Sequence, residues 1–237
     1  MKQWQRWAVA AAWMCGASAA MATITVTGSR DFGGEKVGTS CSGGDESQQP
    51  VILIKDGGTV SNVVLAAGKA ADGIHCEGSC TLKNVTWEDV CEDAATMKGG
   101  SGKTMNINGA TVNNADDKIF QHNGIGSKVN ISNVTVNGTN GKLYRTCGNC
   151  SSQGKRTGAI TDVTVNGTIK SGLAGVNKNY GDTVSIRKVK WKNFDVNKTK
   201  VCVPFNGVIK GNGEAKELPV EWGTTTCNVS KTDITKF

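Results

Sequence analysis

Ser132-Asn133-Val134-Thr135-Val136 is one copy of a short stretch that recurs along this chain of 237 residues. The other copies are Ser61-Asn62-Val63-Val64-Leu65, Lys83-Asn84-Val85-Thr86-Trp87, Asn108-Gly109-Ala110-Thr111-Val112, Thr161-Asp162-Val163-Thr164-Val165 and Arg187-Lys188-Val189-Lys190-Trp191. Apolar and polar residues alternate within each copy, and many are β-branched, which is the pattern of a β-strand. The recurring stretch therefore predicts one strand of a repeated unit.

The spacing of the copies indicates a solenoid. Their central residues are Val63, Val85, Ala110, Val134, Val163 and Val189, separated by 22, 25, 24, 29 and 26 residues. Propeller blades need about 40 residues each, and a leucine-rich repeat needs more leucine than this chain has. Asn and Gly beside the strands suit the left-handed corners of a coil. We expect an all-β, single-domain parallel β-helix, and a right-handed one, since parallel connections normally have that hand.

The N-terminus is typical of an exported protein. Lys2 and Arg6 precede an apolar stretch that is shorter than a membrane span, and small residues follow as far as Ala22. We predict a signal peptide over residues 1–22, a mature domain over residues 23–237, and a secreted, extracellular protein without a membrane anchor. Loss of Lys2 and Arg6 lowers the net charge from +7 to +5.

The cysteines fit the same compartment. Removal of Cys15 with the signal peptide leaves eight of the nine cysteines, and an even number in a secreted chain predicts disulfides. Eight cysteines allow about 105 pairings, so the connectivity stays open. Cys147-Gly148-Asn149-Cys150 has the spacing of a redox motif but no βαβ surroundings, which favours a structural bridge. Because no dense run of Lys or Arg is present, nucleic acid is not an expected partner.

Charged residues recur at one phase of the coil. Asp72, Asp93, Lys118 and Arg145 lie 9, 8, 8 and 11 residues after the nearest repeat centre. Residues at the same phase stack in a solenoid, so these four are expected to form one line on an outer face. Asp116 and Asp117 lie beside Lys118.

The acidic residues of this line suit a metal ion. Asp72, Asp89, Glu92 and Asp93 offer hard oxygen ligands, which Ca²⁺ prefers, whereas a solvated acidic edge is the alternative interpretation. Zinc is disfavoured because only two histidines are present and the cysteines are assigned to disulfides. His75 is expected to be a hydrogen-bonded strand residue. His122 either supports the site beside Lys118 or has a structural role.

Four motifs of the chain carry a family resemblance. They are Ala71-Asp72-Gly73-Ile74-His75-Cys76, Trp87-Glu88-Asp89-Val90-Cys91-Glu92-Asp93-Ala94-Ala95-Thr96, Asp117-Lys118-Ile119-Phe120-Gln121-His122-Asn123 and Leu143-Tyr144-Arg145-Thr146-Cys147-Gly148-Asn149-Cys150. In this order, over roughly residues 40–206, the chain resembles polysaccharide lyase family 3, the small pectate lyases. The resemblance implies a right-handed parallel β-helix, dependence on Ca²⁺ and cleavage of polygalacturonate or low-ester pectin.

The resemblance also implies roles for individual residues. It assigns the calcium site to Asp72, Asp89, Glu92 and Asp93, and the basic residues needed for activity to Lys98, Lys118, Lys142 and Arg145. Glu46 is a looser match to a further acidic position. The chain departs from the family pattern at Thr86, where a second tryptophan is common, and at Lys55. Neither position belongs to the expected site.

These residues lead to a mechanistic hypothesis. Lys118 removes the C5 proton of a galacturonate, because a lysine buried among cations has a lowered pKa, while Arg145 clamps the sugar carboxylate. Lys98 and Lys142 are expected to hold neighbouring carboxylates of the polymer. The reverse assignment, with Arg145 as the base, is the alternative.

Two other functions compete with the lyase. A pectin hydrolase on the same fold would use paired carboxylates such as Asp116 and Asp117, but the chain has no Gly-His-Gly segment. A secreted pectin-binding or effector protein without catalysis is the second rival, although every motif residue is present. A monomer is the default for such a secreted enzyme.

Overall fold

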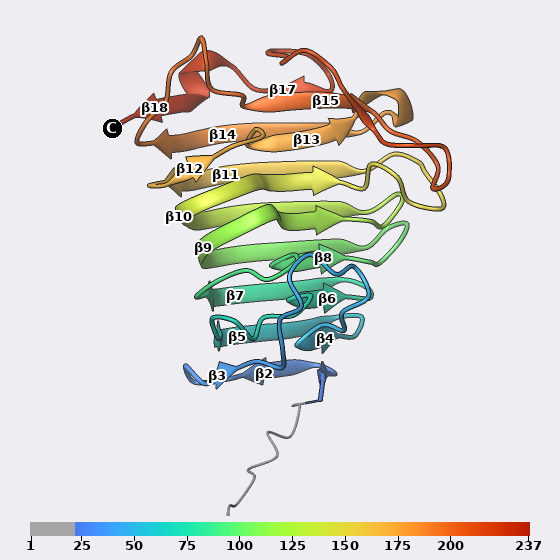
Figure 1. Ribbon diagram of the computed structural model, residues 1–237, viewed down its shortest axis with the longest axis vertical. Helices are drawn as coiled ribbons and strands as arrows, with labels where there is room; N and C mark the ends of the chain where they lie inside the picture. The colour runs from blue at the N-terminus through green and yellow to red at the C-terminus, as the bar shows by residue number, and fades with distance from the viewer. Residues whose placement is uncertain (1–21) are drawn as a thin grey trace, which may run out of the picture.

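The fold is a stack of short strands. The computed structural model describes residues 22–237, so the predicted signal peptide lies outside the described residues except for its last position. In Figure 1 the strands follow one another along the longest axis, from β1–β4 at the N-terminal end to β13–β18 at the C-terminal end. The helices within residues 22–237 are two short 3-10 turns, and none there is long and apolar enough to cross a bilayer.

Two rows of parallel strands run along the stack. The first row is β5(Gly58–Leu65), β7(Cys80–Trp87), the first parts of β9(Thr104–His122) and β10(Lys128–Thr146), β11(Thr157–Val165), β14(Thr183–Trp191), β17(Cys227–Asn228) and β18(Ile234–Lys236). The second row is β1(Ile24–Val26), β4(Ile52–Ile54), β6(Ile74–Cys76), β8(Ala95–Met97), the last parts of β9 and β10, β13(Ala174–Asn177) and β15(Cys202–Asn206). A parallel β-helix is thereby confirmed.

At the N-terminal end, β2(Ser29–Asp31) and β3(Lys36–Val37) pair parallel with β5 and begin the first row. The remaining elements are β12(Thr168–Ile169), which pairs with β10, β16(Lys216–Glu217), and the 3-10 turns η1(Lys178–Tyr180) and η2(Lys231–Asp233). Only β16 pairs antiparallel among the described strands, beside β15.

The predicted repeat is the register of the first row. Val63 pairs with Val85, Val85 with Ala110, and Ala110 with Val134. The ladder continues through Val163 to Val189 and ends at Ile234, a position that the sequence repeat did not reveal. These central residues are buried, so each coil covers the apolar face of the next.

One corner of each coil has a left-handed backbone. Asn62, Asn84 and Asn133 have φ values of 53°, 51° and 54°, and Gly109 has 80° at the equivalent position. These residues directly precede the repeat centres, where Asn and Gly adopt positive φ at least cost. The corner explains why Asn or Gly recurs before the apolar centre.

Four disulfides brace the narrow core, as the sequence predicted. They join Cys41 to Cys91, Cys76 to Cys80, Cys147 to Cys150 and Cys202 to Cys227. The first ties the segment between β3 and β4, the blue loop that rises over β6 and β8 in Figure 1, to the loop between β7 and β8. The last joins the C-terminal coils.

Candidate active site

Three carboxylates meet just before two neighbouring strands of the second row, β6 and β8. Asp72 and Asp93 each lie two residues before a paired position, because Ile74 pairs with Ala95. Ligand oxygens of Asp72, Glu92 and Asp93 lie within 4.8 Å of one another, and all three residues are buried. The coil therefore stacks acids that are 21 residues apart in the sequence.

Burial makes this acid cluster electrostatically unfavourable. It raises the pKa of Glu92 to about 7, with a further contribution from neighbouring Asp72. It also raises the pKa of Asp93 well above its usual range, with Glu92 and Asp72 adding to the rise and Lys118 opposing it. One oxygen each of Asp72 and Asp93, the Oδ1 atoms, is buried without a hydrogen-bond partner. A cation at the cluster would satisfy both the charge and these oxygens.

The donor set therefore fits Ca²⁺. Hard carboxylate oxygens that lack a hydrogen-bond partner are what that ion binds. His75 Nε2 lies 2.7 Å from Asp72 Oδ2, so the imidazole orients this carboxylate and is a hydrogen-bonded strand residue of β6, as expected. Asp89 is half-buried near the cluster in sequence, but the structure does not bring it into the group of three.

Lys118 lies directly beside the acids. Its Nζ is 2.7 Å from Asp117 Oδ2, 3.7 Å from both Glu92 Oε1 and Asp93 Oδ1, and 3.8 Å from Glu46 Oε1. The expectation that cations surround Lys118 is wrong. Burial disfavours its charge, but Asp93, Asp117 and Glu92 outweigh burial, so its pKa is raised.

The predicted line of four residues needs one correction. Lys118 pairs in register with Lys142, not with Arg145, which pairs with Gln121. The two register shifts in β10, between Asn137 and Asn140 and between Asn140 and Lys142, cancel, so Arg145, 11 residues after its repeat centre, lies three positions beyond the phase of Lys118. The line along the solenoid is therefore Asp72, Asp93, Lys118 and Lys142, and Arg145 lies three positions further along β10.

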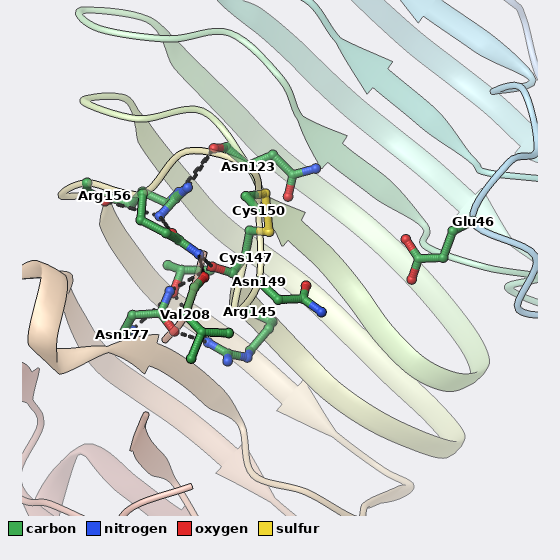
Figure 2. The surroundings of a disulfide bond; sticks show 12 residues. Glu46, Asn123, Arg145, Cys147, Asn149, Cys150, Arg156, Asn177 and Val208 are labelled. Carbon is green, nitrogen blue, oxygen red and sulfur yellow. Dashed lines mark hydrogen bonds between the residues drawn. A yellow bond between two sulfur atoms is a disulfide. The ribbon is translucent and has the colours of Figure 1, made fainter. Parts of the chain in front are cut away.

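Arg145 is a buried cation with fixed geometry. Its guanidinium stacks on the ring of Phe205 at 3.9 Å, and its Nη1 donates to Asn177 Oδ1 at 3.0 Å. Burial lowers its pKa to about 10, although nearby Asp182 acts in the opposite direction. Figure 2 shows Arg145 beside the Cys147–Cys150 disulfide, with Glu46 on the far side of the site.

A cleft beside the acid cluster is lined by the cations of the site. It has a volume of about 600 Å³, and Lys118, Lys142, Arg145, Glu46 and Asp117 are among its lining residues. Burial and the neighbouring Arg145 lower the pKa of Lys142. Lys98 is exposed and does not line this cleft.

One wall of the cleft was not identified from the sequence. It is formed by the segment after β15, which includes Lys210 and Glu214. Val208 N donates to Gly148 O at 2.8 Å, and Asn149 Nδ2 donates to Glu214 Oε2 at 3.2 Å, which joins this segment to the disulfide loop. The segment lies outside the repeat and carries none of the four motifs, so no sequence signal marks it.

His122 does not contact the cleft. It is fully buried, with Nδ1 2.7 Å from the Tyr144 hydroxyl and Nε2 2.7 Å from Ser127 Oγ. Burial lowers its pKa to about 3, so it stays neutral. Of the two roles considered for His122, these contacts support the structural one.

Fold and site together are those of a polysaccharide lyase. Comparison with known proteins narrows the class, since the family model described as pectate lyase matches residues 9–212. The chain belongs to the pectate lyase family, polysaccharide lyase family 3. The predicted family, fold and enzyme class are confirmed.

Relatives cover most of the chain. Pectate lyase E of Emericella nidulans is 43% identical over 198 residues, which is 81% of this chain and 74% of that protein. The structure of pectate lyase PelI from Erwinia chrysanthemi in complex with tetragalacturonic acid has a TM-score of 0.84 and 43% identity, and covers 94% of this chain and 72% of that one. The catalytic domain of PelI has a TM-score of 0.82 and is covered completely.

Proposed function

We propose that this pectate lyase is secreted and cleaves polygalacturonate and low-ester pectin by calcium-dependent β-elimination, releasing 4,5-unsaturated oligogalacturonides. The observation that carries the proposal is the buried group of Asp72, Glu92 and Asp93 beside a cleft lined by Lys118, Lys142 and Arg145. The complex of the related PelI with tetragalacturonic acid supports an oligogalacturonate as substrate.

The three clustered acids would hold the calcium ion, with Asp89 as a further predicted ligand. When bound, calcium would withdraw charge from a galacturonate carboxylate and make the C5 proton more acidic. The cations of the cleft would hold neighbouring carboxylates of the polymer. Lys142 lies in register beside Lys118 and suits this role, whereas exposed Lys98 would serve only a chain that extends beyond the cleft.

Lys118 and Arg145 are the proposed catalytic pair. Lys118 takes the C5 proton, the C–H electrons form the C4=C5 double bond, and the C4–O4 bond breaks, so that O4 leaves and takes a proton from water. Arg145 holds the carboxylate of the reacting sugar and stabilises its growing negative charge. The guanidinium suits this role because Phe205 and Asn177 fix its planar fork.

One observation favours the reverse assignment. The pKa of Arg145 falls to about 10, whereas that of Lys118 rises beside Asp93, Asp117 and Glu92. Arg145 would then be the base and Lys118 the carboxylate partner. Two substitutions, one at Lys118 and one at Arg145, separate the two assignments.

The function itself is tested by ultraviolet absorbance of polygalacturonate mixed with the purified protein at alkaline pH. Unsaturated ends absorb, so we expect absorbance to rise with calcium and to stop rising when a chelator is added. New reducing ends without absorbance would mean hydrolysis. Folded protein that gives neither signal would support the non-catalytic pectin-binding alternative.

The roles of Lys118 and Arg145 are tested with Lys118→Ala and Arg145→Lys in the same assay. Removing a proton-transfer group costs about 10²–10⁴-fold in turnover, so Lys118→Ala should lose activity while calcium still raises its melting temperature. Arg145→Lys keeps the charge but not the bidentate fork, so its turnover should fall with the pH profile unmoved. A pH profile shifted to lower pH in Arg145→Lys would instead assign the base to position 145.

Secretion and the monomeric state belong to the same proposal. The apolar N-terminal stretch and the four disulfides support export to an oxidising compartment. N-terminal sequencing of exported protein should give Thr23 as the first residue, and an uncleaved Met1 would contradict the predicted signal peptide.

A further inference from the structure

The orientation of the Arg145 guanidinium is set mainly by two contacts, beside a longer hydrogen bond from Nη1 to Thr146 Oγ1 at 3.5 Å. The Phe205 ring lies 3.9 Å from Cζ and fixes the plane of the group but leaves it free to turn within that plane. The hydrogen bond from Nη1 to Asn177 Oδ1, 3.0 Å long, fixes the remaining rotation. Figure 2 shows the two side chains joined behind the disulfide loop.

Glycines leave room for this packing. A Cβ at Gly175 would approach Arg145 Cδ to 2.8 Å, and a Cβ at Gly148 would approach Arg145 Nη2 to 2.6 Å. Because Gly175 pairs in register with Arg145, the coil above makes space for the long side chain. The guanidinium therefore has neighbours on several sides, and Asn177 is the one that accepts a short hydrogen bond.

Asn177 is itself held in one orientation. It is fully buried, its Nδ2 donates to Cys147 O at 2.8 Å, and its backbone N donates to Asp182 Oδ2 at 2.9 Å. A carbonyl only accepts and a guanidinium only donates, so the two ends of the amide cannot be exchanged. The same side chain thus connects Arg145 with the disulfide loop that lines the cleft.

We propose that Asn177 is a positioning residue for the lyase reaction, which sets the angle at which Arg145 presents its free N–H groups to the substrate carboxylate. The inference rests on the proposed role of Arg145 in pectate cleavage. Asn177 lies 32 residues after Arg145 and belongs to β13, outside every motif that identified the site.

A double-mutant cycle of Asn177→Ala and Arg145→Lys tests whether Asn177 acts through Arg145. A hydrogen bond to a charged group is worth about a tenfold change in rate, so Asn177→Ala should lower kcat/KM about tenfold or more in the wild-type background. In the Arg145→Lys background the same substitution should change kcat/KM by less than about twofold. An equal loss in both backgrounds would overturn the proposal.

Asn140→Ala is the matched control. Asn140 is also fully buried and donates through Nδ2 to Asn137 O at 2.8 Å, but it has no contact with Arg145. Its removal should lower the melting temperature and leave kcat/KM unchanged. If Asn177→Ala behaves in the same way, Asn177 is merely structural.

A second variant and a second readout keep the test decisive. Asn177→Asp retains an acceptor for Arg145, so it should keep more activity than Asn177→Ala. If the alanine variant does not fold, kcat/KM of the aspartate variant alone is compared with that of the wild type. It should stay within about tenfold, and a larger loss counts against the proposal. Nitrogen-15 NMR of the arginine side chains needs no turnover. Separate Nη signals of Arg145 should merge in the position-177 alanine variant, and unchanged signals would contradict the proposal even if the protein proved not to cleave pectate.

Discussion

At the scale of single residues, the interior of the solenoid is more polar than its repeat of valines suggests. His122, Tyr144 and Ser127 form a hydrogen-bonded group inside the coil, and all three are buried. Both ring nitrogens of His122 are engaged and burial lowers its pKa to about 3. The cost of keeping this histidine neutral appears only when the unfolded chain can bind a proton.

We therefore expect the protein to lose stability in acid through His122. Between about pH 6.5 and pH 3 the unfolded chain binds a proton at this position and the folded chain does not, so stability falls as the pH falls. The loss between pH 7 and pH 5 should be about 2 kcal/mol, and His122→Gln should remove that part of the slope. Urea unfolding of both proteins in chelator measures it, and parallel pH profiles would contradict the burial argument.

At the scale of the element, the left-handed corner before each repeat centre shows how a coil turns. Asn, Gly or Asp occupies most of these corners, and Lys188 is the exception, with φ of 52°. Lysine gains nothing at positive φ, because its side chain cannot bond the local backbone as that of asparagine does. Within residues 22–237 its one ion pair is with Asp162, 3.9 Å away on the surface, and such pairs contribute little.

Lys188→Asn should accordingly stabilise the protein. Relief of the left-handed lysine is worth about 1 kcal/mol, which in a domain of this size raises the melting temperature by about 2–4 °C. Lys190→Asn is the control, since Lys190 is exposed on the same strand with ordinary backbone angles and should bring no gain. Calorimetry measures the melting temperatures of the two variants. Equal shifts would mean that the effect comes from the loss of a charge and not from the left-handed corner.

At the scale of the whole molecule, the sequence predicted what repeats and could not predict what does not. The ladder from Val63 to Val189 and the stacking of Asp72, Asp93 and Lys118 follow from the spacing of strand copies. Arg145 was placed three positions wrong, because the extra residues of this long coil lie after Arg145, between β10 and β11, and not before it. A spacing measured along the chain does not show where a coil takes up an extra residue.

The supporting residues of the site were beyond sequence reasoning for a different reason. Asn177 and Phe205 come from later coils, and each meets Arg145 only because β10 pairs with β13 and β13 with β15. Neither residue belongs to the strand repeat or to one of the four motifs. Only the pairing of β10 with β13 and of β13 with β15 shows that the two side chains converge on one guanidinium.

The two segments that fold back from the ends of the solenoid divide the enzyme into parts with different freedom to change. The proposed catalytic residues Lys118 and Arg145 lie on the middle coils, where any insertion disturbs the neighbours above and below. The walls of the cleft come from the segment between β3 and β4, which carries Glu46 and is held by the Cys41–Cys91 disulfide, and from the segment after β15, and neither has to match a coil. Insertions, deletions or charge changes in these walls can therefore alter which stretches of polymer enter the cleft, while the coils that carry the proposed catalytic residues remain as they are.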